Sequence, residues 1–304
     1  MAPKVAIGAY VYRVQVRKVR DYTALSFSED DLGLKLRQAF LDFTHKFSEP
    51  EDKESTNRRW YFSEMEQEGS GYQGTVEYGR TGFSSRLIDL TSRQVQYERV
   101  ASDLDFIPLF NRFWVPDEYE FGLWVFQSFS GYSCNALMLD DFARFWRSRY
   151  ETTRLAVSAV LPEELKQVRE APEKAVVLKT KTGGGAIADR QLGVNHEDAG
   201  ISFEISARGR DDFGTFGSLK RRFTGKQLDE AMEMDGILFE DAQAKVKING
   251  RTRRVTLAGT GSMNALIDLS RDVKTSAGTG HPTKPSISAA FDEIVKDVVV
   301  GMLE

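Results

Sequence analysis

Apolar and polar residues alternate with a period of two over much of the first 160 residues, and this alternation predicts strands. Residues 4–17 begin the pattern with one apolar face, made of Val5, Ile7, Ala9 and Val11. Further apolar runs follow between residues 72 and 131, separated by Gly, Asp or Pro: TVEYG, RLIDL, QVQYERV, FIPLFNRFWVP and EFGLWVFQSF. Such a succession indicates an antiparallel meander. RLAVSAVLP, at 154–162, predicts one more strand.

Apolar residues at three- and four-residue steps predict helices in the same region and at the end of the chain. The stripe of a helix at 30–47 consists of Leu32, Leu36, Phe40, Phe43 and Phe47. A helix at 135–150 turns inward Met138, Phe142, Phe145 and Trp146. The last helix starts at Ser286, and its stripe consists of Ile287, Phe291, Ile294, Val295, Val298 and Met302.

The borders of these elements carry their own signals. Ser28 precedes three acids, Glu29 to Asp31, and is predicted to cap the first helix. Residues 48–59 are polar and predict a solvated loop. FIPLFNRFWVP and EFGLWVFQSF are rich in Phe and Trp, and we expect both strands at the centre of the sheet. Pro108 and Pro116 are expected at strand ends or bulges.

The second half mixes shorter elements. AVVLKTKTGGGAIADR, GISFEISARG and ALIDLS predict strands, and PEELKQVRE, FGSLKRRF and LDEAMEMD predict helical pieces. Short connections, without the regular β-α-β alternation of a Rossmann fold, favour an α+β fold with mostly antiparallel mixed sheets and packed helices. We expect two subdomains: residues 1–160 (strand, helix, β-meander, helix, strand) and residues 161–304, which hold a basic hairpin and the last helix.

Composition narrows the class of protein. Of the 304 residues 41% are hydrophobic and 28% charged, which is typical of a globular protein. The net charge of −4 argues against a surface that binds nucleic acid everywhere, although a local basic patch remains compatible with it. A single cysteine excludes an intrachain disulfide and a cysteine zinc site. The sequence shows no signal peptide and no apolar run of about 20 residues, so we expect a cytoplasmic protein that does not contact membranes.

The stretch AKVKINGRTRRVTLAG, residues 244–259, is the clearest candidate for a binding element. Two arms of β character flank Asn249-Gly250, and five of the sixteen residues are Lys or Arg. A two-residue type I′ turn would place Lys245 opposite Arg254, on the face shared by Lys247. Facing like charges need a counter-charge. A phosphate backbone could supply it, and so could the six acids between Asp229 and Asp241.

Two earlier segments, ARGRDD and SLKRRFTGK, add further cations to this half of the chain. The candidate nucleic-acid-binding residues are therefore Arg208, Arg210, Lys220, Arg221, Arg222, Lys226, Lys245, Lys247, Arg251, Arg253 and Arg254. Few aromatic residues lie among them, and this disfavours a surface that stacks on the bases of a single strand. A solvated or acid-paired face is the alternative interpretation of the same residues.

Candidate catalytic residues are sparse. Asp103 and Asp105 precede a buried strand, and with Glu204 they could hold a divalent cation in a nuclease; capping of turns is the alternative role for such acids. No strand with the Glu-x-Lys pattern follows them. The triple glycine at 183–185 lacks the Lys-Ser/Thr of a P-loop, and His45, His196 and His281 lack metal-site spacing. Cys134 lies where a thiolate is favoured, but no base partner is evident. We expect no cofactor and no metal.

Two blocks resemble segments of uncharacterised prokaryotic proteins of similar size that occur in phage-defence or mobile loci. They are IPLFNRFWVPDEYEFGLWVFQSFSGYSCNALMLDDF and IDLSRDVKTSAGTGHPTKPSISAAF. The resemblance lies in strands, glycines and a helix, and it brings no active residues with it. It implies a bacterial cytoplasmic context and a role in defence.

Three hypotheses follow. In the first, the chain is a non-catalytic defence component that binds DNA, RNA or a protein from the same locus through its basic surface. In the second, it is a metal-dependent nuclease with a site assembled only in the fold. In the third, it is a structural or oligomerisation module whose last helix docks to a partner or to another copy.

Overall fold

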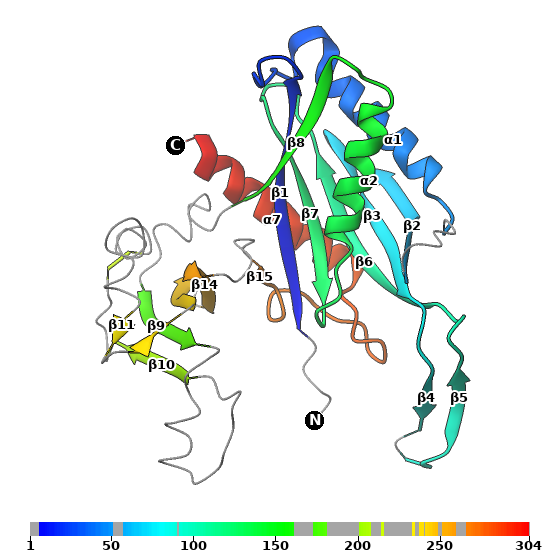
Figure 1. Cartoon of the computed structure of the whole chain (residues 1–304), viewed down its shortest axis with the longest axis vertical. Helices are drawn as coiled ribbons and strands as arrows, with labels where there is room; N and C mark the ends of the chain where they lie inside the picture. Colours follow the sequence, from blue (N-terminus) through cyan, green and yellow to red (C-terminus); the bar gives the residue numbers. More distant parts are fainter. Residues whose placement is uncertain are drawn as a thin grey trace. The chain divides into compact units, whose positions relative to one another are not determined.

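A computed structural model describes residues 6–50, 57–89, 91–160, 173–180, 201–207, 214–215, 233–234, 237–239, 241–248, 251–259 and 266–303 (Figure 1). Contacts group the chain into two units. One comprises Met1–Ser158 and Leu269–Phe291, and the other Ala159–Asp268 and Asp292–Glu304. Helices and antiparallel sheets occur together, so the α+β class is confirmed.

A large antiparallel sheet forms the core of the first unit. Its strands there are β1 (Ile7–Lys18), β2 (Arg58–Gln67), β3 (Gly71–Arg80), β6 (Asp105–Trp114), β7 (Gly122–Phe129) and β8 (Thr153–Ala159). The short strand β15 (Ile267–Asp268), just before the unit boundary at Leu269, is the seventh strand of the sheet. The order is β15-β1-β7-β6-β3-β2, and β8 also pairs with β1. The pairings from β2 through β3, β6 and β7 to β1 are antiparallel, which confirms the meander for TVEYG, FIPLFNRFWVP and EFGLWVFQSF. RLIDL and QVQYERV were wrongly placed in it, because they pair with each other in a separate hairpin. Every residue of β7 is buried, and the central position expected for β6 and β7 is confirmed.

Two helices cover one face of this sheet with aromatic side chains. They are α1 (Leu32–Lys46) and α2 (Asn135–Arg147). The ring of Phe40 in α1 stacks on Phe113 of β6 at 4.1 Å between centroids, and it also contacts Trp124 and Phe142. The apolar stripes predicted for both helices are buried. The apolar residues that recur every three or four positions are the buried ones, because each helix packs only one side against the sheet.

The last helix, α7 (Lys284–Leu303), begins on the opposite face. Its Phe291 packs against Phe110 of β6 at 5.4 Å, and the Ser288 hydroxyl lies 2.8 Å from the side-chain oxygen of Gln73. Residues 110 and 113 have opposite parity in β6, so their side chains point to opposite faces. The predicted stripe of α7 is buried from Ile287 to Val298. The stripe is thus already covered, and docking of this helix to a partner stays a prediction.

The start of the first helix was predicted wrongly. Glu29–Asp31 form a 3-10 turn, α1 begins only at Leu32, and Ser28 makes no capping hydrogen bond. Asp30 and Asp31 have φ values of 49° and 55°, in the left-handed region that short polar side chains tolerate. An α-helix cannot run through these angles, so it starts after them.

Other sequence predictions also need correction. The loop predicted at 48–59 ends earlier, because Arg58 and Arg59 already pair with Arg80 and Gly79 in β3. Pro108 lies inside β6, at a position beyond the stretch that pairs with β7, where its missing N–H breaks no bond to that strand. Within the predicted helix LDEAMEMD, Glu233–Met234 form strand β11, which pairs with β12 (Ile237–Leu238).

A separate hairpin interrupts the meander between β3 and β6. It consists of β4 (Ser85–Ile88) and β5 (Val95–Arg99), which pair with each other and form a two-stranded sheet of their own. Figure 1 shows the hairpin extending away from the seven-stranded sheet. We refer to residues 81–104 as the arm.

The second unit contains a four-stranded antiparallel sheet in the order β10-β9-β13-β14. Its strands are β9 (Glu173–Thr180), β10 (Ile201–Ser206), β13 (Asp241–Ile248) and β14 (Arg251–Gly259). The strands expected in AVVLKTK, GISFEIS and the basic hairpin are thereby confirmed. The predicted helices PEELKQVRE and FGSLKRRF and the triple glycine lie outside the described residues.

Candidate nucleic-acid interface

The basic hairpin has the register that the sequence predicts. Lys245 of β13 pairs with Arg254 of β14, and Lys247 pairs with Thr252. Ile248 pairs with Arg251 across the Asn249-Gly250 step, whose own residues are outside the described part of the chain. Because cross-strand partners share a face, the backbone places the cationic positions 245, 247 and 254 on one face of the sheet.

The remaining two cations of the hairpin occupy positions on the other face. Arg253 pairs with Val246 and Arg251 with Ile248. Val246 and Ile248 lie on the same face of β13 as Ala242 and Ala244, which are buried. The five basic residues of the hairpin therefore do not form one patch. The alternation of the strands divides them into a set of three and a set of two.

The position of β14 at the end of the strand order matters for access. Among the strands that the structure describes, β14 pairs only with β13, so Arg254 lies on the edge strand of this sheet. Val177 of β9, which pairs with Gln243 and thus shares the face of Lys245, is buried. The same face of β9 also carries Lys179, which pairs with Asp241.

Six of the predicted basic residues fall in segments that the structure does not describe. These are Arg208, Arg210, Lys220, Arg221, Arg222 and Lys226. Their part in nucleic-acid binding stays a prediction.

The paired acids of the nuclease hypothesis have a structural role at the base of the arm. The Asp103 carboxylate accepts hydrogen bonds from the Tyr97 hydroxyl at 2.5 Å and from the Val100 backbone N–H at 2.9 Å. These hydrogen bonds lower the pKa of Asp103 below its ordinary value, and the bond from Tyr97 has the larger effect. Asp105 opens β6 and lies 3.4 Å from the guanidinium of Arg99. The capping role, which was the alternative, fits these contacts.

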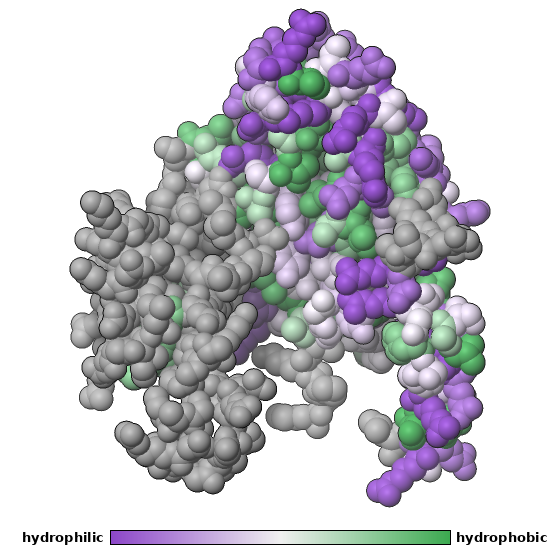
Figure 2. Space-filling model, viewed as in Figure 1, coloured by the Kyte–Doolittle hydropathy of each residue, from purple (hydrophilic) through white to green (hydrophobic). Residues whose placement is uncertain are grey.

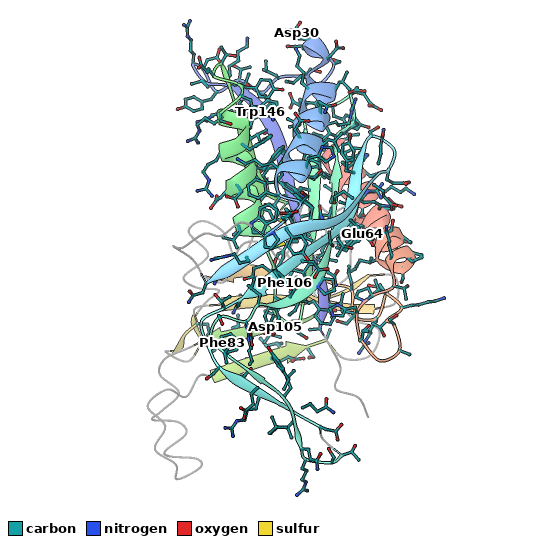
Figure 3. The ribbon with its side chains drawn as sticks, turned by 90° about the vertical axis from the view of Figure 1, so that its right-hand side faces the viewer. Asp30, Glu64, Phe83, Asp105, Phe106 and Trp146 are labelled. Carbon is teal, nitrogen blue, oxygen red and sulfur yellow. The ribbon has the colours of Figure 1, made fainter. Side chains whose placement is uncertain are left out.

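Arg99 is the residue that sequence reasoning missed. Its side chain is buried, and it donates to the backbone oxygens of Arg80 and Asp103 as well as to Asp105. The guanidinium carbon lies 4.1 Å above the centre of the Phe83 ring. A single cation thus ties together both ends of the arm, where its partners Phe83 and Asp105 are labelled in Figure 3. No periodicity marks such a residue, because its partners are the last residue of β3, the first residue of β6 and a turn residue between the strands.

Glu204, the third acid, lies in β10 of the second unit, where it is exposed and accepts a hydrogen bond from Ser206 at 3.1 Å. Asp103 and Asp105 belong to the first unit. Across the described ranges, no three His, Cys, Asp or Glu side chains come together as ligands for a metal ion. The described acids therefore give the nuclease hypothesis no site.

The other single candidates also have structural surroundings. Burial raises the pKa of the Cys134 thiol to about 12, so the residue is a thiol and not the thiolate that its position suggested. The His281 ring stacks on Phe129 at 4.0 Å, and burial lowers its pKa. His45 is exposed on α1, and His196 is outside the described residues.

No protein-family model and no curated protein sequence matches this chain. Among the described helices, none is long and apolar enough to span a membrane.

Proposed function

We propose that the protein binds nucleic acid through β13 and β14 and does so without catalysis of its own. The observation that carries the proposal is the pairing of Lys245 with Arg254 at the edge of a four-stranded sheet, with Lys247 on the same face. Like charges that face each other across strands destabilise a sheet unless an anion lies between them. The phosphates of a nucleic-acid backbone are regularly spaced anions, and these three cationic positions can bind them.

The overall charge of the chain supports a local interface rather than a general one. With a net charge of −4, the protein as a whole repels polyanions. Attraction must then come from cations within about one Debye length of the phosphates, roughly 8 Å at physiological salt. Binding is expected to be sensitive to salt and weak in sequence preference, because contacts to phosphate carry no base information.

The cellular role we propose is that of a component of a prokaryotic anti-phage defence system, in the cytoplasm and together with a protein from the same locus. This part rests on the resemblance of residues 107–142 and 267–291 to proteins of such loci. It is separable from the binding activity, which can be tested on the purified chain alone.

The test compares two double charge reversals in one hairpin. Lys245→Glu with Arg254→Glu reverses two of the three cationic positions of one face, and Arg251→Glu with Arg253→Glu reverses both cationic positions of the other. Both variants change the net charge equally, so the second controls for long-range electrostatics. We expect the first pair to weaken binding of single- and double-stranded DNA and RNA at least tenfold, measured by fluorescence anisotropy, and the second pair to act less. Absence of binding by the wild-type chain at low salt would refute the proposal.

A further inference from the structure

Two arginines of the first unit face each other across neighbouring strands. Strand β8 pairs with β1, and the backbone N–H of Val19, just after β1, donates to the carbonyl of Thr152, just before β8, at 3.1 Å. Because β1 ends where β8 begins, the two strands run in opposite directions from this hydrogen bond. Two residues away from it along each strand, Arg17 is opposite Arg154.

This pair lies on the face of the large sheet that α1 and α2 do not cover. The Thr153 hydroxyl accepts a hydrogen bond of 3.2 Å from the indole of Trp146 in α2, so the next side chain, Arg154, points to the other face. The Tyr12 hydroxyl also accepts a hydrogen bond from α2, and Arg17 has the opposite parity in β1. Figure 2 shows mainly hydrophilic residues at the end of the first unit where β1 ends in Figure 1.

Neither guanidinium has a carboxylate partner among the residues that the structure describes. Asp21, the acid closest to Arg17 along the chain, accepts the backbone N–H of Thr23 at 3.1 Å instead. Glu151, the acid closest to Arg154, is exposed in the turn before β8. Both arginines are half-buried. Facing cations without an anion destabilise a sheet, and partial burial increases the effect because such pairs are screened less by salt.

Neighbouring side chains hold the two guanidinium groups. Gln15, which lies on the same face of β1, accepts a hydrogen bond of 2.8 Å from an Nη atom of Arg17. The guanidinium carbon of Arg154 lies 3.7 Å above the centre of the Tyr22 ring. In both arginines the Nε atom is buried and has no acceptor in the described part of the chain. A buried donor without an acceptor costs free energy, so we expect an acceptor that the chain itself does not supply.

We propose that Arg17 and Arg154 together bind a phosphate group, as the dianion of inorganic phosphate or of a phosphomonoester. A guanidinium presents two parallel N–H groups along one planar edge, and this geometry matches two oxygens of a phosphate. Two such groups on facing strands bring two positive charges to one dianion. A carboxylate carries a single charge and would leave half of the positive charge uncompensated. Phosphate therefore fits the pair better.

This site does not depend on nucleic-acid binding by β13 and β14. Arg17 and Arg154 belong to the first unit, and both strands of the basic hairpin belong to the second. The phosphates of a nucleic-acid backbone are diesters with one negative charge each, whereas the paired arginines match a dianion. The double variant Lys245→Ala with Arg254→Ala should therefore bind phosphate at this site as the wild type does.

Calorimetric titration of the full chain with sodium phosphate, at constant ionic strength set by sodium chloride, is the first test. We expect one phosphate per chain at this site, with a Kd on the order of 1 mM or below. Arg17→Gln and Arg154→Gln should each weaken binding by about tenfold or more, because the dianion then meets a single guanidinium. Arg147→Gln is the matched control, since it removes an exposed arginine of α2 with the same change in net charge.

Thermal unfolding gives a second measurement, which separates binding from packing. Without phosphate, Arg17→Gln removes one of two facing like charges, so the unfolding temperature should stay the same or rise. Phosphate should raise the unfolding temperature of the wild type by mass action and that of the variant much less. A variant that is less stable without phosphate, yet gains as much from phosphate as the wild type, would show that the arginine only packs, and would overturn the proposal.

Titrations with AMP and with adenosine distinguish the two sources of the phosphate group. They are made at about pH 8, where a phosphomonoester is a dianion because its second pKa is about 6. Tighter binding of AMP than of phosphate, lost in Arg154→Gln and absent for adenosine, would assign the site to a phosphomonoester. Tighter binding of inorganic phosphate would assign it to the free ion. Binding of neither compound would overturn the proposal, and so would equal phosphate affinities of Arg17→Gln and Arg147→Gln.

Discussion

The hydroxyl of Tyr97 donates a hydrogen bond of 2.5 Å to the carboxylate of Asp103, and this bond connects β5 to the turn that leads back into the large sheet. The bond lowers the pKa of Asp103 and raises the pKa of Tyr97. Both shifts favour the ionised acid beside the neutral phenol. The acid pair that the sequence offers as metal ligands for a nuclease instead fixes the arm.

The first prediction concerns pH. A lowered pKa means that Asp103 stabilises the base of the arm above its unfolded value, about 3.9, and loses this effect as pH falls through the folded value. The raised pKa of Tyr97 stabilises the base below its unfolded value, about 10, and the effect is lost as pH rises through the folded value. Hydrogen exchange, corrected for intrinsic rates, should therefore show constant protection of the arm between these limits. Loss of protection near neutral pH would contradict the account.

Substitution of the same acid gives a second prediction. Asp103→Asn keeps the size of the side chain but removes the negative charge of the carboxylate to which the Tyr97 hydroxyl and the Val100 N–H donate. Trypsin should then cut the arm after Arg86 or Arg93 faster, because a hydrogen bond to an ionised acceptor is stronger than one to a neutral acceptor. Asp140→Asn, an exposed acid on α2, is the control. Equal cleavage rates in the two variants would show that Asp103 does not hold the arm.

The aromatic core supplies a third prediction. Phe40 is fully buried and contacts the rings of Phe113, Trp124 and Phe142. Phe40→Ala should lower the free energy of unfolding by about 3–5 kcal/mol, whereas Leu34→Ala on the exposed side of α1 should change it by less than about 0.5 kcal/mol. Urea denaturation followed by tryptophan fluorescence measures both. Similar values for the two variants would mean that α1 does not pack on the sheet as described.

A buried hydrogen bond provides a fourth. The indole N–H of Trp60 donates to the carboxylate of Asp141 at 3.1 Å, and Asp141 also pairs with Arg144. Asp141→Ala leaves a buried donor without its acceptor and should cost about 1–3 kcal/mol. Asp141→Asn retains an acceptor oxygen and should cost less. The order of the two variants in the same denaturation assay checks the assignment; a reversed order would contradict it.

The parts of the fold that the sequence predicts well are those set by one dominant periodicity. The stripes with Phe40, Phe142 and Phe291 are buried as expected, because each helix hides one side against the sheet. The pairing of Lys245 with Arg254 follows from a two-residue turn, which fixes the register of the whole hairpin.

Predictions fail where tertiary contacts decide. The helix signal at Ser28 is overridden by the left-handed turn of Asp30 and Asp31, and the first residues of β2 are polar because their pairing with β3 supplies the stabilisation. The role of Arg99 is invisible in the sequence, since its partners at Arg80 and Asp105 meet only when the chain folds back on itself. Candidate acids were recognisable by type, but their function was not.

The salt dependence of nucleic-acid binding tests the central claim most directly. Each phosphate contact contributes about 0.9 to the slope of log K against log salt on double-stranded DNA. If Lys245 and Arg254 each contact a phosphate, the double variant Lys245→Ala with Arg254→Ala should reduce the magnitude of that slope by nearly two. The double variant Arg251→Ala with Arg253→Ala should change it less. A slope that stays the same when Lys245 and Arg254 are removed would show that β13 and β14 do not bind the phosphate backbone through this face.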